Sequence, residues 1–341
     1  LRIFKFSDVD EYGFRRAEDF DYKKYEKFMS TYLKILAKRR LRWEIFMRKN
    51  PDLTKMTPTL KRFIRKGVPG MFHHNYHEEC VLYKTKAIFY YYYLFLKHYK
   101  NDLQTFIKTY LEHVSIKISV RFLDIPRTFP DNIYFETKKE KLYNILMAYA
   151  HHNREVGYCQ GLNYIAGLLV IITDNEESTF WLLKVIVENI VPLYHTKNMT
   201  NLLRDLAVFK ELIILRVPEI NRHIENLALP YAVIASKWFI CLYAEVLPVE
   251  TVLRIWDCVF SEGYKILFRV ALTIMIIHKN KILETDDISA LANLFRTEAL
   301  SDEIVTNCHT FMESVFKVPG NLKRRDLEGR LRIFVKSIQK N

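Results

Sequence analysis

The chain has 341 residues, half of them hydrophobic and 14% aromatic, so it can bury a sizeable core and is too apolar to be disordered. Its formal net charge is +13, and its 9 glycines and 10 prolines are too few for a turn-rich β fold and favour helices. The 5 cysteines lie far apart without a CxxC pair, which is typical of reduced thiols in a cytosolic protein rather than of a disulfide framework.

The positive charge suits an acidic partner, an anionic membrane surface or nucleic acid. The basic residues form short clusters along the chain, a pattern that is also typical of solvated helix faces, and no nucleic-acid-binding motif accompanies them. We therefore expect no nucleic-acid partner, while transient contact with an anionic membrane stays open. No signal peptide is visible, and the apolar runs at 87–96 and 164–173 are too short to span a bilayer, so a cytoplasmic location is expected.

Apolar residues recur at helical spacing through most of the chain. The first stripe, between Tyr25 and Leu36, predicts an amphipathic helix, which Pro51 and Pro58 separate from the rest of the chain. Later stripes predict helices over residues 142–149, 202–213, 252–259 and 267–277. The best strand-like alternation is Val114–Val120, and it stands alone. The sequence thus predicts an all-α fold.

Two short segments each place one long polar side chain in an apolar setting. In Asp124-Ile-Pro-Arg127-Thr-Phe-Pro130 the prolines keep Arg127 out of a helix, and Asp124 is spaced to hold its guanidinium group. In Gly157-Tyr-Cys-Gln160-Gly161 the glycines allow a tight turn around Gln160. In GTP hydrolysis, an arginine can stabilise charge on the transferring phosphoryl group and a glutamine can orient the attacking water.

These motifs and their order resemble the TBC domain, the family of GTPase-activating proteins for Rab GTPases. Besides the two segments above, the second of which continues to Gly167, the resemblance is carried by Arg65-Lys-Gly-Val-Pro69, Ser236-Lys-Trp238-Phe-Ile-Cys-Leu-Tyr243, Pro248 and Arg254-Ile-Trp256-Asp257. It covers about residues 60–285, and several multi-residue motifs occur in the family's order.

The resemblance implies an all-helical, V-shaped TBC domain at residues 60–285, an N-terminal helical extension at 1–59, and C-terminal helices at 286–341 that pack on the domain. It implies that Arg127 is an arginine finger and Gln160 a glutamine finger, both inserted in trans into the nucleotide site of a Rab. Such a chain activates the GTPase of its partner rather than acting as an independent enzyme, and it takes part in vesicle trafficking. It needs no cofactor of its own, because the partner binds GTP and Mg²⁺, and it reaches membranes peripherally through that partner.

The resemblance also implies roles for the other motif residues. Asp124 belongs to the arginine-finger motif. The glutamine loop is shaped by Tyr158, Gly161 and Asn163. Four further residues are expected to be structural: Trp238, Arg254, Trp256 and Asp257.

The chain departs from the family after Gly67-Val-Pro69, where His73 and His77 stand in place of an arginine and a tryptophan. Two histidines four residues apart share a helix face, so the cluster His73–Cys80 has the residue types of a metal site. A single cluster with no distant partner is a weak signal, and we expect no metal.

Two alternatives remain open at this point. Arg127 and Asp124 could form a structural ion pair with no catalytic role. The protein could also be a catalytically weak Rab-binding effector or scaffold, if the divergent region alters the geometry of the fingers. A GTP-hydrolysis assay over a panel of Rabs separates an activator from an effector.

Overall fold

The structure is a computed structural model, and it describes residues 8–16, 18, 20–50, 56–68, 124–298, 307–322, 327 and 329–330. Within these ranges helices dominate, and β structure is limited to two isolated bridges, Val9 with Arg15 and Phe14 with Asn132. The predicted all-α fold is confirmed. The strand-like stretch at 114–120 and the histidine cluster at 73–80 lie outside the described residues.

Every apolar stripe predicted above lies in a helix of the structure. The five stripes fall, in chain order, in α1, α6, α9, α12 and α13. Their bounds are α1 (Tyr22–Lys49), α2 (Pro58–Lys66), the 3₁₀ turn η2 (Glu136–Lys138), α6 (Lys139–His152), α7 (Leu162–Thr173), α8 (Glu176–Lys184), the π-helical η3 (Val185–Ile190), α9 (Thr200–Arg216), α10 (Pro218–Asn226), α11 (Tyr231–Ile240), α12 (Val249–Glu262), α13 (Lys265–Ile277), α14 (Lys279–Leu283), α15 (Ile288–Asn293), the π-helical η4 (Leu294–Glu298) and α18 (Cys308–Lys317).

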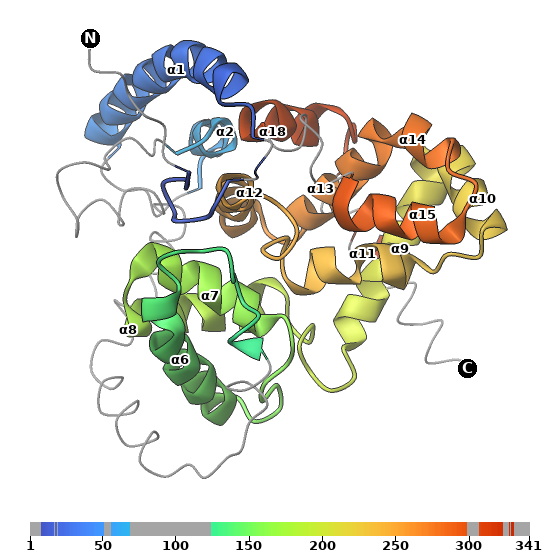
Figure 1. Cartoon of the computed structure of the whole chain (residues 1–341), viewed down its shortest axis with the longest axis horizontal. Helices are drawn as coiled ribbons and strands as arrows, with labels where there is room; N and C mark the ends of the chain where they lie inside the picture. The colour runs from blue at the N-terminus through green and yellow to red at the C-terminus, as the bar shows by residue number, and fades with distance from the viewer. Residues whose placement is uncertain are drawn as a thin grey trace.

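The helices gather in two lobes that diverge from one another (Figure 1). Helices α6, α7 and α8 pack together in one lobe, and α9 packs with α10, α11 and α13 in the other. A third group joins elements far apart in the sequence, because α2 and α18 both pack on α12. Two lobes agree with the V shape that the resemblance implies. The three-part division at residues 59 and 285 stays a prediction.

Helix α1 is joined to α2 by one buried aromatic residue. Trp43 is 4% exposed, and its indole Nε1–H donates to the carbonyl of Gly67, 3.0 Å away. Gly67 ends α2 with φ of 104°, a conformation that favours glycine. Of the residues of α1, only Tyr32 and Trp43 are buried, so the helix lies along the body of the protein and keeps most of its surface in solvent. None of the described helices combines the length and the apolar composition needed to span a bilayer.

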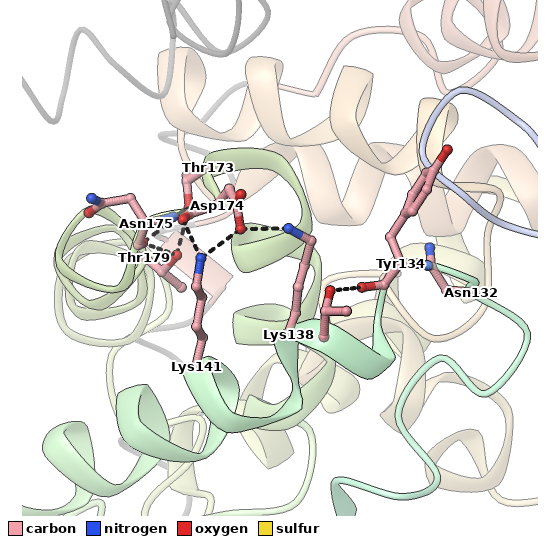
Figure 2. A network of polar contacts seen from close by, with 9 residues as sticks. Asn132, Tyr134, Lys138, Lys141, Thr173, Asp174, Asn175 and Thr179 are labelled. Atoms are coloured by element: carbon pink, nitrogen blue, oxygen red, sulfur yellow. Dashed lines mark hydrogen bonds and ion pairs between the residues drawn. The ribbon is translucent and has the colours of Figure 1, made fainter. Parts of the chain in front are cut away.

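A polar clamp ties the start of α6 to the end of α7 (Figure 2). Lys138 and Lys141 approach one carboxylate oxygen of Asp174 at 2.6 and 2.9 Å, and Lys141 also donates to its carbonyl. Burial would raise the pKa of Asp174, but the hydrogen bonds from the two lysines outweigh it and lower that pKa. The clamp fixes α6 relative to α7, the two helices that the segment Gly157–Gly161 connects.

Candidate functional site

Arg127 is held by Asp124, the residue three positions before it. Its Nε–H donates to Oδ1 of Asp124 at 2.7 Å, and Nη2 lies 2.5 Å from the same oxygen. The hydrogen bond raises the pKa of Arg127, so the guanidinium stays charged. The arginine side chain is 49% exposed, whereas that of Asp124 is 8% exposed. One edge of the guanidinium is therefore anchored, and Nη1 has no partner among the described residues.

Tyr158 binds the other oxygen of the same carboxylate. Its hydroxyl donates to Oδ2 of Asp124 at 2.5 Å, across 34 residues of sequence. Burial, together with this hydrogen bond, raises the pKa of Tyr158, so the phenol remains a donor at neutral pH. Asp124 thus joins the arginine segment to the glutamine segment.

A second hydrogen bond joins the two segments in the interior. Asn163, at the start of α7, is fully buried and donates from Nδ2 to Oγ1 of Thr128 at 2.7 Å. Its Oδ1 accepts from the backbone N–H of Gly161 at 3.0 Å. The hydroxyl of Thr128 in turn donates to the carbonyl of Asp124 at 2.7 Å. Because every atom in this chain of hydrogen bonds is paired, the two segments are fixed relative to each other.

Gln160 extends from the joined segments into solvent. Its side chain is exposed and makes no hydrogen bond with the described residues. Gly161 follows it with φ of 109°, and a Cβ there would lie 3.4 Å from both Ile240 and the sulfur of Cys241. The glutamine turn therefore packs closely on the end of α11 through a glycine. Arg127 and Gln160 are brought to one site, as two exposed polar side chains on a buried framework.

Phe129 and Gly167 set how closely the arginine segment packs on α7. Phe129 has φ of 47° and places its ring edge-on to those of Phe14, Phe135 and Tyr164. A Cβ on Gly167 would lie 3.1 Å from both Phe129 and the methyl group of Thr128. Only a residue without a side chain lets the segment approach this closely.

The tryptophans predicted to be structural surround the turn between α11 and α12. In this turn Leu242 and Tyr243 have φ of 47° and 67°, a region that non-glycine residues adopt at a cost of about 1–3 kcal/mol each. The turn is held by three hydrogen bonds: Trp256 Nε1 to the Leu242 carbonyl at 2.9 Å, the Tyr243 N–H to the Trp238 carbonyl at 2.9 Å, and the Tyr243 hydroxyl to the Leu267 carbonyl at 2.8 Å. The same turn begins at Cys241, whose sulfur packs against Gly161 of the glutamine segment.

Arg254 and Asp257 lie buried on α12, away from the turn that Trp256 holds. Arg254 donates to the carbonyl of Arg65 at 3.3 Å, and its guanidinium fills the space over Gly67, where a Cβ would come within 2.7 Å of it. Asp257 is 4% exposed and makes no hydrogen bond in the described part of the chain. Burial raises the pKa of Asp257 to about 8, although nearby Arg254 opposes that rise.

Asp257→Asn is expected to change how stability depends on pH. The folded pKa of Asp257 lies above its ordinary value of 3.8. The folded state therefore holds the proton more tightly than the unfolded state, and the carboxyl lowers the free energy of unfolding as pH rises from about 4 to about 8. The variant lacks this carboxyl, so it should gain stability over the parent at pH 8 relative to pH 5. Urea denaturation at both pH values measures the difference, and an equal difference at both would show that Asp257 does not titrate on unfolding.

Metal ligands do not cluster in the described ranges, where no group of three or more His, Cys, Asp and Glu side chains could hold an ion. The predicted absence of a metal and of a resident cofactor stays a prediction, because the cluster at 73–80 falls outside those ranges.

The site and fold define a helical domain that presents a paired arginine and glutamine on a rigid framework. A family model described as the Rab-GTPase-TBC domain matches residues 39–283. The chain therefore belongs to the Rab-GTPase-TBC domain family, as its motifs predict.

Full-length relatives and a solved structure agree with this assignment. Growth hormone-regulated TBC protein 1 of Homo sapiens is 40% identical over 324 residues, which cover 92% of this chain and 91% of that protein. Growth hormone-regulated TBC protein 1-A of Danio rerio is 39% identical over 329 residues, covering 93% of this chain and 86% of that protein. The crystal structure of the Chlamydomonas flagellar RabGAP TBC domain is 28% identical with a TM-score of 0.72, and the match covers 92% of this chain and all of that one.

Proposed function

We propose that this protein accelerates GTP hydrolysis by a Rab GTPase, supplying Arg127 as an arginine finger and Gln160 as a glutamine finger in trans. The observation that carries the proposal is the double connection between the segments that bear them, Asp124 with Tyr158 and Thr128 with Asn163. Two separately mobile segments would have to be ordered on each encounter. A preformed pair avoids that entropy cost when the partner binds.

The arginine is arranged to act on an anion. Asp124 occupies Nε and Nη2, and the remaining donors of the guanidinium fork point away from that carboxylate. In the complex these donors stabilise the negative charge that develops on the transferring phosphoryl group. The ion pair between Arg127 and Asp124 is present, as the purely structural interpretation of Arg127 also requires. On this proposal, the ion pair serves to orient the arginine finger.

The glutamine is arranged to act on water. Its amide offers both a donor and an acceptor, the combination needed to hold a water molecule in line with the phosphorus atom. Since the partner binds GTP and Mg²⁺, the protein completes an active site rather than forming one alone. On this proposal it works in the cytoplasm, in vesicle trafficking, and meets membranes where its Rab resides.

The test is stimulated GTP hydrolysis measured over a panel of purified Rabs with the full chain. We expect faster hydrolysis with at least one Rab. Binding to a GTP-loaded Rab without stimulation of any panel member would replace this proposal with the effector or scaffold alternative.

Gln160→Ala should lower the rate of hydrolysis more than it lowers affinity for the Rab. The lost amide positions water in the transition state, so the deficit should persist when the activator saturates the Rab. Single-turnover hydrolysis at rising activator concentration separates the two effects. Because the side chain of Gln160 is exposed and makes no hydrogen bond with the described residues, the variant should have the same melting temperature as the parent. A deficit that disappears at saturation would mean that Gln160 serves only binding.

A further inference from the structure

Helix α1 concentrates much of the positive charge of the protein. Its 28 residues include ten lysines and arginines and two glutamates, which give a net charge of +8, against +13 for the whole chain. The two segments of the proposed site lie outside α1, so the proposed function does not account for this charge. The helix lies at the periphery of the molecule (Figure 1).

The outer face of α1 combines exposed basic side chains with exposed aliphatic ones. Leu41 and Ile45, four residues apart, are 58% and 47% exposed. Basic residues at spacings of three, four and seven from them share this face, and all are exposed: Lys34, Lys38, Arg48 and Lys49. None of these four forms an ion pair with the described residues. Glu44, on the flank, is partly buried and is already paired with Arg40 at 2.9 Å.

The inner face explains why this outer face is left in solvent. Tyr32 and Trp43 are the buried residues of α1, and the bond from Trp43 to Gly67 fixes which side of the helix faces the protein. Leu41 lies two residues before Trp43 and Ile45 two residues after it, so both point well away from the buried side. Folding therefore holds the two aliphatic residues in solvent rather than leaving them there by chance.

We propose that the outer face of α1 docks on an anionic membrane surface. Lysine and arginine side chains gain energy next to anionic lipid headgroups, and Leu41 and Ile45 can bury themselves at the boundary between headgroups and acyl chains. The phosphates of duplex nucleic acid would also bind these lysines and arginines, but a duplex backbone provides no apolar surface in which Leu41 and Ile45 could be buried. The mixture of both residue types on one face favours the lipid surface.

The experiment measures binding of the full chain to phosphatidylcholine vesicles with and without phosphatidylserine, by flotation and with no GTPase present. We expect binding only when phosphatidylserine is present. A basic residue near such a surface contributes roughly fivefold to binding, so Lys34→Gln/Lys38→Gln should weaken it by about tenfold or more. Leu41→Ser/Ile45→Ser should also weaken it several-fold, and the binding that remains should be more sensitive to salt.

Lys197→Gln/Arg222→Gln is the matched control. Both residues are exposed and lie outside α1, and the control removes the same charge. It should bind vesicles far better than the α1 variants do. Equal loss in the control and in Lys34→Gln/Lys38→Gln would show that net charge alone drives binding, and would overturn the assignment to α1.

Two other outcomes would also overturn the proposal. One is the absence of binding to phosphatidylserine vesicles. The other is tighter binding to duplex DNA than to vesicles, with no effect of Leu41→Ser/Ile45→Ser, which would assign the face to nucleic acid. Because no GTPase is in the assay, each result is independent of whether Arg127 and Gln160 act as fingers.

Discussion

Replacing Arg127 with alanine is expected to abolish stimulated hydrolysis by a responsive Rab while the fold survives. An arginine finger contributes about 10³–10⁵ in rate in GTPase systems. The arginine side chain is half exposed, and its buried partner Asp124 keeps the hydrogen bond from the Tyr158 hydroxyl, so the melting temperature should fall only slightly below that of the parent. Single-turnover hydrolysis and a thermal scan of the same preparation measure both quantities.

Two variants make the result for Arg127 specific. Arg127→Lys keeps the charge but loses the planar fork, so it should remain severely impaired. Arg222→Ala removes an exposed arginine from α10, outside the proposed site, and should stimulate hydrolysis like the parent. If Arg127→Ala melted lower yet stimulated a Rab as well as the parent does, the pair with Asp124 would be structural and the finger assignment would fail.

Trp256→Ala should destabilise the whole domain. The indole is completely buried and its N–H holds the carbonyl of Leu242 in a strained turn. Truncating a buried tryptophan typically costs about 3–5 kcal/mol, a large fraction of the stability of a domain. Activity should then fall together with the melting temperature and solubility, unlike in the finger variants. Differential scanning calorimetry beside the hydrolysis assay tests this.

Trp256→Phe separates the loss of volume from the loss of the hydrogen bond. Phenylalanine fills much of the space but leaves the Leu242 carbonyl without its donor, so an intermediate melting temperature is expected. A Trp256→Ala protein that melts like the parent yet no longer stimulates a Rab would move this residue from the core to the partner surface.

The helices could be predicted because long apolar stripes specify a buried face before any tertiary contact is known. α9, α12 and α13 are of this kind. The π-helical ends of α8 and α15, at η3 and η4, could not, since they depend on how the last turn packs rather than on local periodicity.

The pairing of Arg127 with Asp124 was predicted from their spacing and is present, whereas the roles of Arg127 and Gln160 as fingers stay a prediction. The contributions of Thr128 and Ile240 were missed. Thr128 meets Asn163 across 35 residues, and the end of α11 supports Gly161 from a distant part of the sequence, so no local pattern contains either contact. The left-handed backbone of Phe129 could not be predicted from the sequence either, because bulky side chains such as phenylalanine rarely adopt a positive φ.

The close packing at Gly167 makes the proposed site vulnerable to sequence changes that touch neither finger. A methyl group there would lie 3.1 Å from the Thr128 methyl group and the Phe129 ring, so these side chains would have to shift by a few tenths of an ångström. Reactive groups must be held to within about 0.5 Å of their productive geometry. An alanine at this position would look like an ordinary conservative change within an apolar helix. A TBC chain could therefore retain its arginine and glutamine, keep its fold, and still have the framework under both shifted by an amount that uses up much of this tolerance.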